Sequence, residues 1–294
     1  MQPHSLTPVS RRGALAALAA ACSGLAACSP LRVLNAVSGG DAVVQTGLPY
    51  GPGPRRQLDL YLPPPELARP ADGWPAVLFF YGGSWNNGDR ADYRFVGEAL
   101  AQRGIAAAVA DYRLYPEVSY PAFLQDSAAA MAWLLAHAGE HGADPARIHL
   151  MGHSAGAYNA AMLALDKRWL AAAGHSPREL AGWVGLAGPY DFLPTGNKDV
   201  QPVFHHPDYP RDSQPLDWAS AASPRCFLGA AATDTLVDPQ RSTVALAKRL
   251  RAQGVAVELM LYDKPSHATL IAAFAPPLRW LAPVLDDVAG FISR

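Results

Sequence analysis

One serine of this sequence lies where a hydroxyl group can be activated as a nucleophile. Residues 152–156 read Gly-His-Ser-Ala-Gly, after a short apolar run at 148–151 and before Ala, Met and Leu at helical spacing up to Asp166. Strand, G-x-S-x-G and helix form a nucleophile elbow, whose sharp turn lifts the serine hydroxyl clear of a sheet. The small residues on either side let strand and helix pass closely. We predict that Ser154 is a nucleophile; a structural glycine-rich turn is the alternative.

Such a serine needs a base to accept its proton, and His267 is the best-placed histidine. It follows an apolar stretch, 255–262, across a short turn, which puts it at a carboxyl end of the predicted sheet. His153 neighbours Ser154, but adjacent side chains point apart, and His149 is expected to pack beside the elbow strand. The other histidines fall at helix ends, in an irregular segment or in the amino-terminal leader: His137, His141, His175, His205, His206 and His4.

The acid that orients this base should follow a strand located between the serine and the histidine. The apolar run 225–231 supplies that strand, with Asp234 and Asp238 just after it, and Asp191 is a third candidate. Asp234 is nearer the strand end, where an anchored backbone fixes a carboxylate best. Asp238 precedes Pro239 and a helical pattern, a position that suits a helix N-cap. The resulting chain order of serine, aspartate and histidine is a known order of the catalytic triad.

Backbone N–H groups aimed at a developing oxyanion complete a site of this kind. Ala155, which follows the serine, is expected to supply one of them. Gly82 and Gly83 follow the apolar run 76–80 directly and are expected to supply the others. A glycine pair lets the backbone approach a substrate without side-chain clash. A plain turn is the alternative for this pair.

Strand and helix patterns alternate along the chain, which predicts a mostly parallel central sheet with helices on both faces. Polar and apolar residues alternate at 57–62, which predicts a half-exposed edge strand there. Residues 189–217 break the rhythm and are expected to form an irregular functional insertion. The other expected strands are 76–80, 105–110, 148–151, 183–187, 225–231 and 255–262, and the expected helices are 93–103, 120–137, 155–166, 239–253 and 277–292.

The amino terminus has the pattern of an export signal. Arg11-Arg12 precedes an uncharged run, mostly Ala and Leu, that ends in Leu25-Ala26-Ala27-Cys28. This ending resembles the lipobox of bacterial lipoproteins, in which the cysteine is diacylated. Cys22 is a weaker candidate for the lipidated cysteine. The Ala-rich run is too short to favour a transmembrane anchor. Arg11-Arg12 gives a weak indication of a twin-arginine export signal. We predict a signal peptide at 1–27, a tether at 28–44 and a catalytic domain at 45–294.

These features predict a lipid-anchored protein of the bacterial cell envelope, on the periplasmic side. Ser29 is not acidic, which favours the outer membrane. Without residues 1–27 the chain keeps 22 basic and 25 acidic residues, a net charge of −3, so nucleic-acid binding is not indicated. Cys226 lies in an apolar run and is expected to be a buried, inert thiol. Ligand-spaced clusters and glycine fingerprints are missing from the sequence, so we expect neither metal nor cofactor.

Three motifs resemble the carboxylesterase and hormone-sensitive-lipase-like branch of the α/β-hydrolases. They are Tyr81-Gly82-Gly83-Ser84-Trp85, Asp111-Tyr112-Arg113-Leu114 with Pro116-Glu117, and Gly152-His153-Ser154-Ala155-Gly156. The resemblance covers residues 45–290 and is closest to small bacterial esterases grouped with feruloyl esterases and kynurenine formamidases. It implies Asp234, in the pattern Asp-x-x-Val, as the acid, with Asp238 as the runner-up, and His267 as the base.

The chain departs from that family at two positions. Tyr81 stands where the family usually has His, which affects how the oxyanion loop is braced, and Ala231 stands where it often has Gly. The resemblance also implies structural bracing by four polar residues, Asp111, Arg113, Glu117 and Asp126. Four aromatic residues suit a pocket wall or ordinary core equally well: Trp85, Phe204, Tyr209 and Trp218. Trp85 and His206 are our candidate substrate contacts.

We predict a serine hydrolase that cleaves small-molecule carboxylic esters through an acyl-enzyme. An amidase, formamidase or peptidase with the same triad is the first alternative, because these reactions differ mainly in the protonation of an amine leaving group. A non-catalytic envelope protein on a hydrolase fold is the second alternative, because a fold alone does not establish a function.

Overall fold

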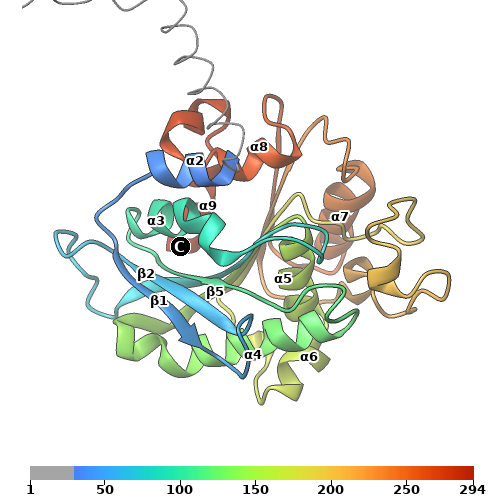
Figure 1. Ribbon diagram of the computed structural model, residues 1–294, viewed down its shortest axis with the longest axis horizontal. Helices are drawn as coiled ribbons and strands as arrows, with labels where there is room; N and C mark the ends of the chain where they lie inside the picture. The colour runs from blue at the N-terminus through green and yellow to red at the C-terminus, as the bar shows by residue number, and fades with distance from the viewer. Residues whose placement is uncertain (1–29) are drawn as a thin grey trace, which may run out of the picture.

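An eight-stranded sheet runs through the centre of the computed structural model, which describes residues 30–294 (Figure 1). Its strand order is β1-β2-β4-β3-β5-β6-β7-β8. The strands are β1 Val43–Pro49, β2 Gln57–Leu62, β3 Trp74–Phe80, β4 Ala106–Ala110, β5 Ala143–His153, β6 Gly182–Leu186, β7 Cys226–Ala231 and β8 Val257–Tyr262.

The sheet is parallel from β4 through β3 to β8, whereas β1 and β2 pair antiparallel. The inner strands consist of nearly continuous apolar residues, and every residue of β4, β6 and β7 is buried. Strands of that composition need cover on both faces, which parallel sheets receive from their crossover helices. The predicted mostly parallel sheet with helices on both faces is confirmed.

Helices cover the two faces in the arrangement that crossover connections impose. In Figure 1, α3 and α9 lie on one face, and α4, α5 and α6 lie on the other. The helices are α2 Pro30–Val37, α3 Arg94–Ala101, α4 Ala122–His137, α5 Ala155–Leu165, α6 Lys167–Ala172, α7 Ala245–Ala252, α8 His267–Ala272 and α9 Val284–Ser293. Shorter turns are η1 Arg90–Tyr93, η2 Ala138–His141, η3 Pro177–Glu179, η4 Pro202–Phe204, η5 Pro215–Trp218, the π-helical η6 Gln240–Val244 and η7 Pro276–Leu281.

Strand β2 is not the half-exposed edge strand that its alternating pattern predicts. Its four central residues are buried, because β1 occupies the sheet edge beside it. The polar member of the pattern, Asp59, points into a buried network, where its carboxylate accepts hydrogen bonds from Gly47 N at 2.8 Å and Arg90 Nε at 2.9 Å. The sequence pattern alone cannot distinguish such a buried, hydrogen-bonded aspartate from a polar residue on the exposed face of an edge strand.

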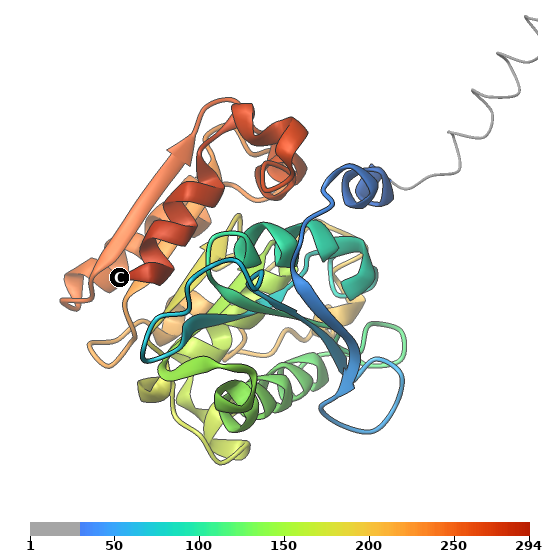
Figure 2. The same cartoon turned by 90° about the vertical axis from the view of Figure 1, so that its left-hand side faces the viewer.

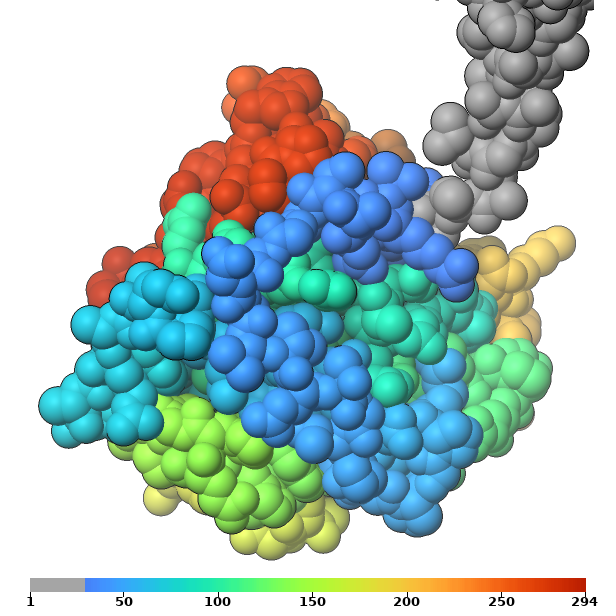
Figure 3. Space-filling view, turned by 60° about the vertical axis from the view of Figure 1, so that its left-hand side comes forward, coloured from blue at the N-terminus to red at the C-terminus, as the bar shows by residue number. Residues whose placement is uncertain are grey.

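Helix α2 lies within the segment 28–44 that the sequence predicts to be a tether. Leu31 and Leu34 lie on one face of this helix and pack against the core. The side-chain amide of Asn35 donates to Ala91 O at 2.8 Å and accepts from Phe95 N at 3.0 Å. The blue amino-terminal segment accordingly lies on the body of the domain in Figure 3. The predicted signal peptide at 1–27 and Cys28 lie outside the described residues.

The carboxyl-terminal part differs from the single helix expected at 277–292. Turn η7 and helix α9 divide that stretch, with Pro283 at the break, because proline cannot donate the hydrogen bond that would join them. Helix α8, which begins at His267, was not anticipated by the sequence pattern. Figure 2 shows the last helix, in red, running alongside the strand β8. None of the helices formed by residues 30–294 has the length and apolarity that crossing a membrane requires.

Candidate active site

The nucleophile elbow joins β5 to α5 as the G-x-S-x-G motif predicts. Ser154 has φ 54° and ψ −122°, and its N–H donates to Leu186 O at 2.8 Å. A Cβ on Gly152 would lie 2.1 Å from Gly156 O, and a Cβ on Gly156 would lie 2.0 Å from Phe80 O. The two glycines are therefore needed for the close approach of strand and helix.

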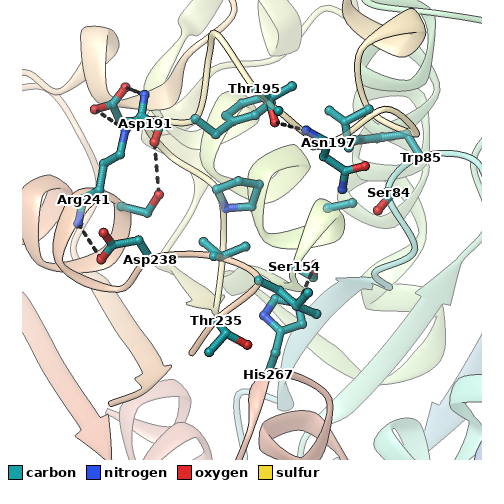
Figure 4. Close-up of a pocket in the computed structure, with 18 of the residues that line it drawn as sticks. Ser84, Trp85, Ser154, Asp191, Thr195, Asn197, Thr235, Asp238, Arg241 and His267 are labelled. Atoms are coloured by element: carbon teal, nitrogen blue, oxygen red, sulfur yellow. Dashed lines mark hydrogen bonds and ion pairs between the residues drawn. The ribbon is translucent and has the colours of Figure 1, made fainter. Parts of the chain in front are cut away.

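Ser154, His267 and Asp234 form one hydrogen-bonded chain. Ser154 Oγ lies 2.8 Å from His267 Nε2, and Asp234 Oδ2 lies 2.7 Å from His267 Nδ1. The three residues follow β5, β8 and β7 respectively, so they meet at the carboxyl edge of the parallel sheet. Figure 4 shows the ring of His267 directed at Ser154. The structure thus brings together the three residues that the sequence singles out.

Asp234 is held as a charged hydrogen-bond acceptor. It is 7% exposed, and its Oδ1 accepts from Leu236 N at 2.9 Å and Val237 N at 3.1 Å. Burial alone would raise the pKa of Asp234, but the hydrogen bond and charge of His267, together with these backbone donors, lower it. The carboxylate therefore fixes a proton on His267 Nδ1 and leaves Nε2 free to accept the serine proton.

The two alternative acids have other partners. Asp238 Oδ1 accepts from Gln240 N at 2.8 Å and Arg241 N at 3.3 Å, which is the helix-capping arrangement expected for it. Asp191 forms an ion pair with Arg241, with Nη2 and Oδ1 3.2 Å apart. Neither carboxylate is hydrogen-bonded to His267.

The glycine loop after β3 lies beside the nucleophile. A Cβ on Gly82 would lie 2.9 Å from Ser154 Cβ, and Gly83 has φ 129°, with Asn87 O only 2.1 Å from where its Cβ would stand. Ser84 and Ala155 line the pocket, whereas Gly82 and Gly83 are not among its lining residues. The backbone N–H groups of Gly83, Ser84 and Ala155 donate no hydrogen bond to an acceptor among residues 30–294. Ser84 is not among the oxyanion donors predicted from the sequence, because that prediction relied on the two glycines that precede it.

Tyr81 braces this loop in place of the histidine that is usual in the family resembled. Its hydroxyl donates to Asp111 Oδ1 at 2.7 Å and accepts from Arg55 Nη2 at 2.8 Å. The same guanidinium donates to Gly88 O at 2.6 Å, at the far end of the loop. The Tyr81 carbonyl accepts from the Tyr112 hydroxyl at 2.8 Å. Both ends of the loop are thus tied to one buried polar network.

Three of the four polar residues expected to brace the fold do so. Asp111 also pairs with Arg90, and Asp126 accepts from Arg113 Nε and Nη2, both at 2.8 Å. Glu117 does not, because it lies exposed on the surface and makes no ion pair with residues 30–294. The position of Glu117 beside Pro116 in the motif does not indicate whether its side chain is buried.

A pocket of about 360 Å³ opens over the serine and the histidine (Figure 4). Its apolar wall includes Trp85, which is 2% exposed, stacks with Phe192 at 5.9 Å and donates from Nε1 to Asn159 Oδ1 at 3.0 Å. The opposite side carries the ion pair between Asp191 and Arg241. Most of the remaining lining comes from the insertion: Pro189, Pro194, Thr195, Gly196, Asn197 and Val200.

His206, which the sequence suggests as a substrate contact, does not line this pocket. It is exposed, and its Nδ1 bonds to the Tyr209 hydroxyl at 3.1 Å. The pocket lining includes no insertion residue beyond Val200. Phe204 packs in the core against Trp85, with ring centroids 4.9 Å apart. Trp218 is partly buried, and the Arg168 guanidinium lies over its ring, 4.3 Å from the ring centroid. The insertion has no hydrophobic period, so its sequence does not indicate which of its side chains face the pocket.

Cys226 lies in strand β7 and does not line the pocket. Cys226 is fully buried, and burial raises the pKa of its thiol to about 12, as expected of an inert cysteine. Within residues 30–294, His, Cys, Asp and Glu form no cluster of three that would hold a metal.

Comparison with known proteins relates this chain to a family. The BD-FAE family model matches residues 58–250, more than half of the chain. An isoprenylcysteine alpha-carbonyl methylesterase of Arabidopsis thaliana is 28% identical over 272 residues, covering 85% of this chain and 62% of its own. Carboxylesterase NlhH of Mycobacterium tuberculosis is 42% identical over 95 residues, covering 32% of this chain and 30% of its own.

A solved structure of an esterase from Thermogutta terrifontis has a TM-score of 0.64 and 25% identity, over 78% of this chain and 84% of its own. The chain spans between 32% and 62% of the length of the isoprenylcysteine methylesterases it matches. The fold shared with these proteins is that of the α/β-hydrolases, in the hormone-sensitive-lipase-like branch.

Proposed function

The chain belongs to the BD-FAE family, and we propose that it is a serine hydrolase that cleaves carboxylic esters through an acyl-enzyme. The observation that carries the proposal is the hydrogen-bonded chain from Asp234 through His267 to Ser154 beneath an open pocket. The names of its relatives, carboxylesterase and methylesterase, agree with this reaction class.

In the first half-reaction, Ser154 Oγ attacks the ester carbonyl carbon while His267 Nε2 takes the serine proton. Asp234 accepts from Nδ1–H and stabilises the imidazolium that forms. The negative charge on the carbonyl oxygen needs backbone donors, and the N–H groups of Gly83, Ser84 and Ala155 are free for that task. Collapse of the intermediate breaks the carbon–alkoxide bond, and His267 protonates the leaving alcohol.

The second half-reaction repeats the same proton movements with water. His267 Nε2 removes a proton from water as the oxygen attacks the acyl carbon, and the proton then returns to Ser154 Oγ as the acid leaves. The reaction consumes one water and requires no redox partner. The same residues therefore serve both steps.

The pocket supports substrates with one apolar and one polar part. Trp85 and Phe192 line the pocket on one side, while Arg241 and Asp191 make the opposite side polar. A cavity of about 360 Å³ suits small esters, whereas a long acyl chain would extend beyond it.

A series of nitrophenyl esters of increasing acyl length tests the reaction, with the matched nitroanilide of the best ester as the comparison. We expect turnover of the short esters and little or none of the anilide. Preferential turnover of the anilide would assign the protein to amide hydrolysis, and inactivity toward both would leave a non-catalytic member of the family.

We further propose that Cys28 carries a lipid that anchors the protein to the periplasmic side of the bacterial outer membrane. The sequence Leu25-Ala26-Ala27-Cys28 after an uncharged run supports this, as does the non-acidic Ser29. Helix α2 begins at Pro30, so the body of the domain would lie close to the bilayer surface.

A further inference from the structure

His153 is a buried histidine that the proposed reaction does not use. It ends strand β5 immediately before Ser154, is 4% exposed, and does not line the pocket. Its Nε2 lies 3.0 Å from the backbone oxygen of His267, although 114 residues separate the two. The contact therefore links the main chain of the base directly to the residue that precedes the nucleophile.

The geometry fixes which nitrogen of His153 carries hydrogen. A carbonyl oxygen only accepts, so Nε2 must be the donor and Nδ1 must be the bare nitrogen. Nδ1 is buried without a hydrogen-bond partner among residues 30–294, and a Cβ on Gly82 would stand 3.2 Å from it. A second proton on Nδ1 would find no acceptor, so His153 is held in a single neutral tautomer.

The titratable neighbours of His153 reinforce that state. Burial lowers the pKa of His153 to about 3, and the positive charge that His267 acquires during the reaction acts in the same direction. Asp234 is the other charged group that influences it, and it acts in the opposite direction. The two imidazole rings have centroids 5.1 Å apart, so a charged His153 would oppose formation of the His267 imidazolium.

We propose that His153 is a positioning residue that holds the backbone of the general base in register with the nucleophile. Its Nε2–H fixes the carbonyl of His267, the first residue of the short helix α8, and so limits movement of the ring that must stay 2.8 Å from Ser154 Oγ. This inference rests on the proposed function, because it assigns a role within that triad.

Two substitutions at this position separate positioning from packing. His153→Leu keeps a comparable volume without the donor, and it also removes the unpaired Nδ1, so the fold should survive. His153→Gln places an amide N–H close to where Nε2 stands. We expect kcat on a short nitrophenyl ester to fall by about tenfold to a hundredfold in His153→Leu with KM nearly unchanged, and to recover to within a few-fold of wild type in His153→Gln.

His149 offers a matched control, because it is buried on the same strand and contacts Arg225 and the Arg147 carbonyl away from the pocket. His149→Leu should change the melting temperature and leave kcat close to that of the wild type. Wild-type kcat in His153→Leu would overturn the inference, as would a His153→Gln variant that is folded yet as slow as His153→Leu. If His153→Leu fails to fold, His153→Gln is compared instead with His153→Asn, whose side chain is shorter. Equal kcat values in those two variants would contradict the positioning role.

An NMR measurement distinguishes failure of this inference from failure of the proposed function. The ring proton of His267 that is shared with Asp234 should keep its resonance in His153→Gln and shift or broaden in His153→Leu. If the wild type hydrolysed no ester, the proposed function would fail, and an unchanged resonance in His153→Leu would separately reject the positioning role.

Discussion

Ser154 holds a backbone conformation that its own side chain disfavours. A φ of 54° for a non-glycine residue costs about 1–3 kcal/mol, and the surrounding hydrogen bonds and packing must hold it. The bond from Ser154 N to Leu186 O and the close contact of Gly152 with Gly156 supply that restraint. The strain directs the hydroxyl toward the one histidine that is oriented to receive its proton.

The roles of Asp234 and Asp238 can be separated by substitution. Asp234→Asn removes the acceptor that fixes the His267 tautomer, so turnover should fall by about 10⁴-fold in a folded protein. Asp238→Ala removes two backbone hydrogen bonds at the start of η6, so unfolding free energy should fall by about 1 kcal/mol with turnover largely kept. Turnover and melting temperature of both variants check this. An inactive Asp238→Ala of normal stability, beside an active Asp234→Asn, would exchange the two roles.

Two buried histidines of β5 make stability depend on pH. Burial lowers the pKa of His149 to about 4 and that of His153 to about 3, whereas unfolded histidines titrate near about 6.5. Between those values the unfolded chain binds more protons, so unfolding free energy should fall as pH decreases below about 6.5, by about 1 kcal/mol per pH unit for each histidine. Urea denaturation at several pH values measures the slope.

The His149→Leu variant is the control for that slope. It should remove about half of the loss of unfolding free energy, because one of the two titrating groups is gone. Asp234, whose pKa is lowered, adds nothing to the slope until the pH falls below the ordinary aspartate value of about 3.9. A slope that is the same in the variant and the wild type would show that other groups govern it.

At the scale of elements, the site residues that directly follow a regular strand could be predicted from the sequence. Ser154, Asp234 and His267 follow β5, β7 and β8, and apolar runs marked those strands clearly. A carboxyl strand end fixes the position of the next few residues, so the candidate triad could be inferred without a structure.

The locations of residues in irregular segments could not be inferred from strand ends. His206 is a candidate substrate contact that does not line the pocket, whereas Asp191 and Arg241 line its polar side. The insertion has no period, so nothing in the sequence indicated which of its side chains face Ser154. Helix α2 could not be predicted, because a few scattered residues of a short helix, among them Leu31, Leu34 and Asn35, make its docking contacts.

The loop between β3 and η1 depends on the network around Tyr81. Tyr81→Phe keeps the ring stacked on Tyr112 at 4.9 Å but removes hydrogen bonds with Asp111 and Arg55. We expect unfolding free energy to fall by about 1–3 kcal/mol, because a buried carboxylate loses a donor. We also expect kcat to fall by about tenfold as the loop loosens. Denaturation and ester kinetics measure both, and unchanged values of both would show that Tyr81 does not brace the site.

At the scale of the whole molecule, the amino-terminal segment connects the domain to its proposed anchor. Cys28→Ser should give a protein that no longer partitions into the detergent phase, because a thioether-linked lipid can no longer form. Mass spectrometry of the natural wild-type protein should find a lipidated residue at its amino terminus. An unmodified Cys28 in that preparation would refute the anchor, while leaving the proposed hydrolase reaction unaffected.

The identity of the nucleophile is the central claim, and mass spectrometry after fluorophosphonate labelling tests it most directly. We expect a single adduct on the peptide that contains Ser154, and no adduct in Ser154→Ala. The variant should keep the wild-type circular dichroism spectrum and melting temperature, while ester turnover falls by about 10⁶-fold. An adduct on another residue, or undiminished labelling of Ser154→Ala, would contradict the account.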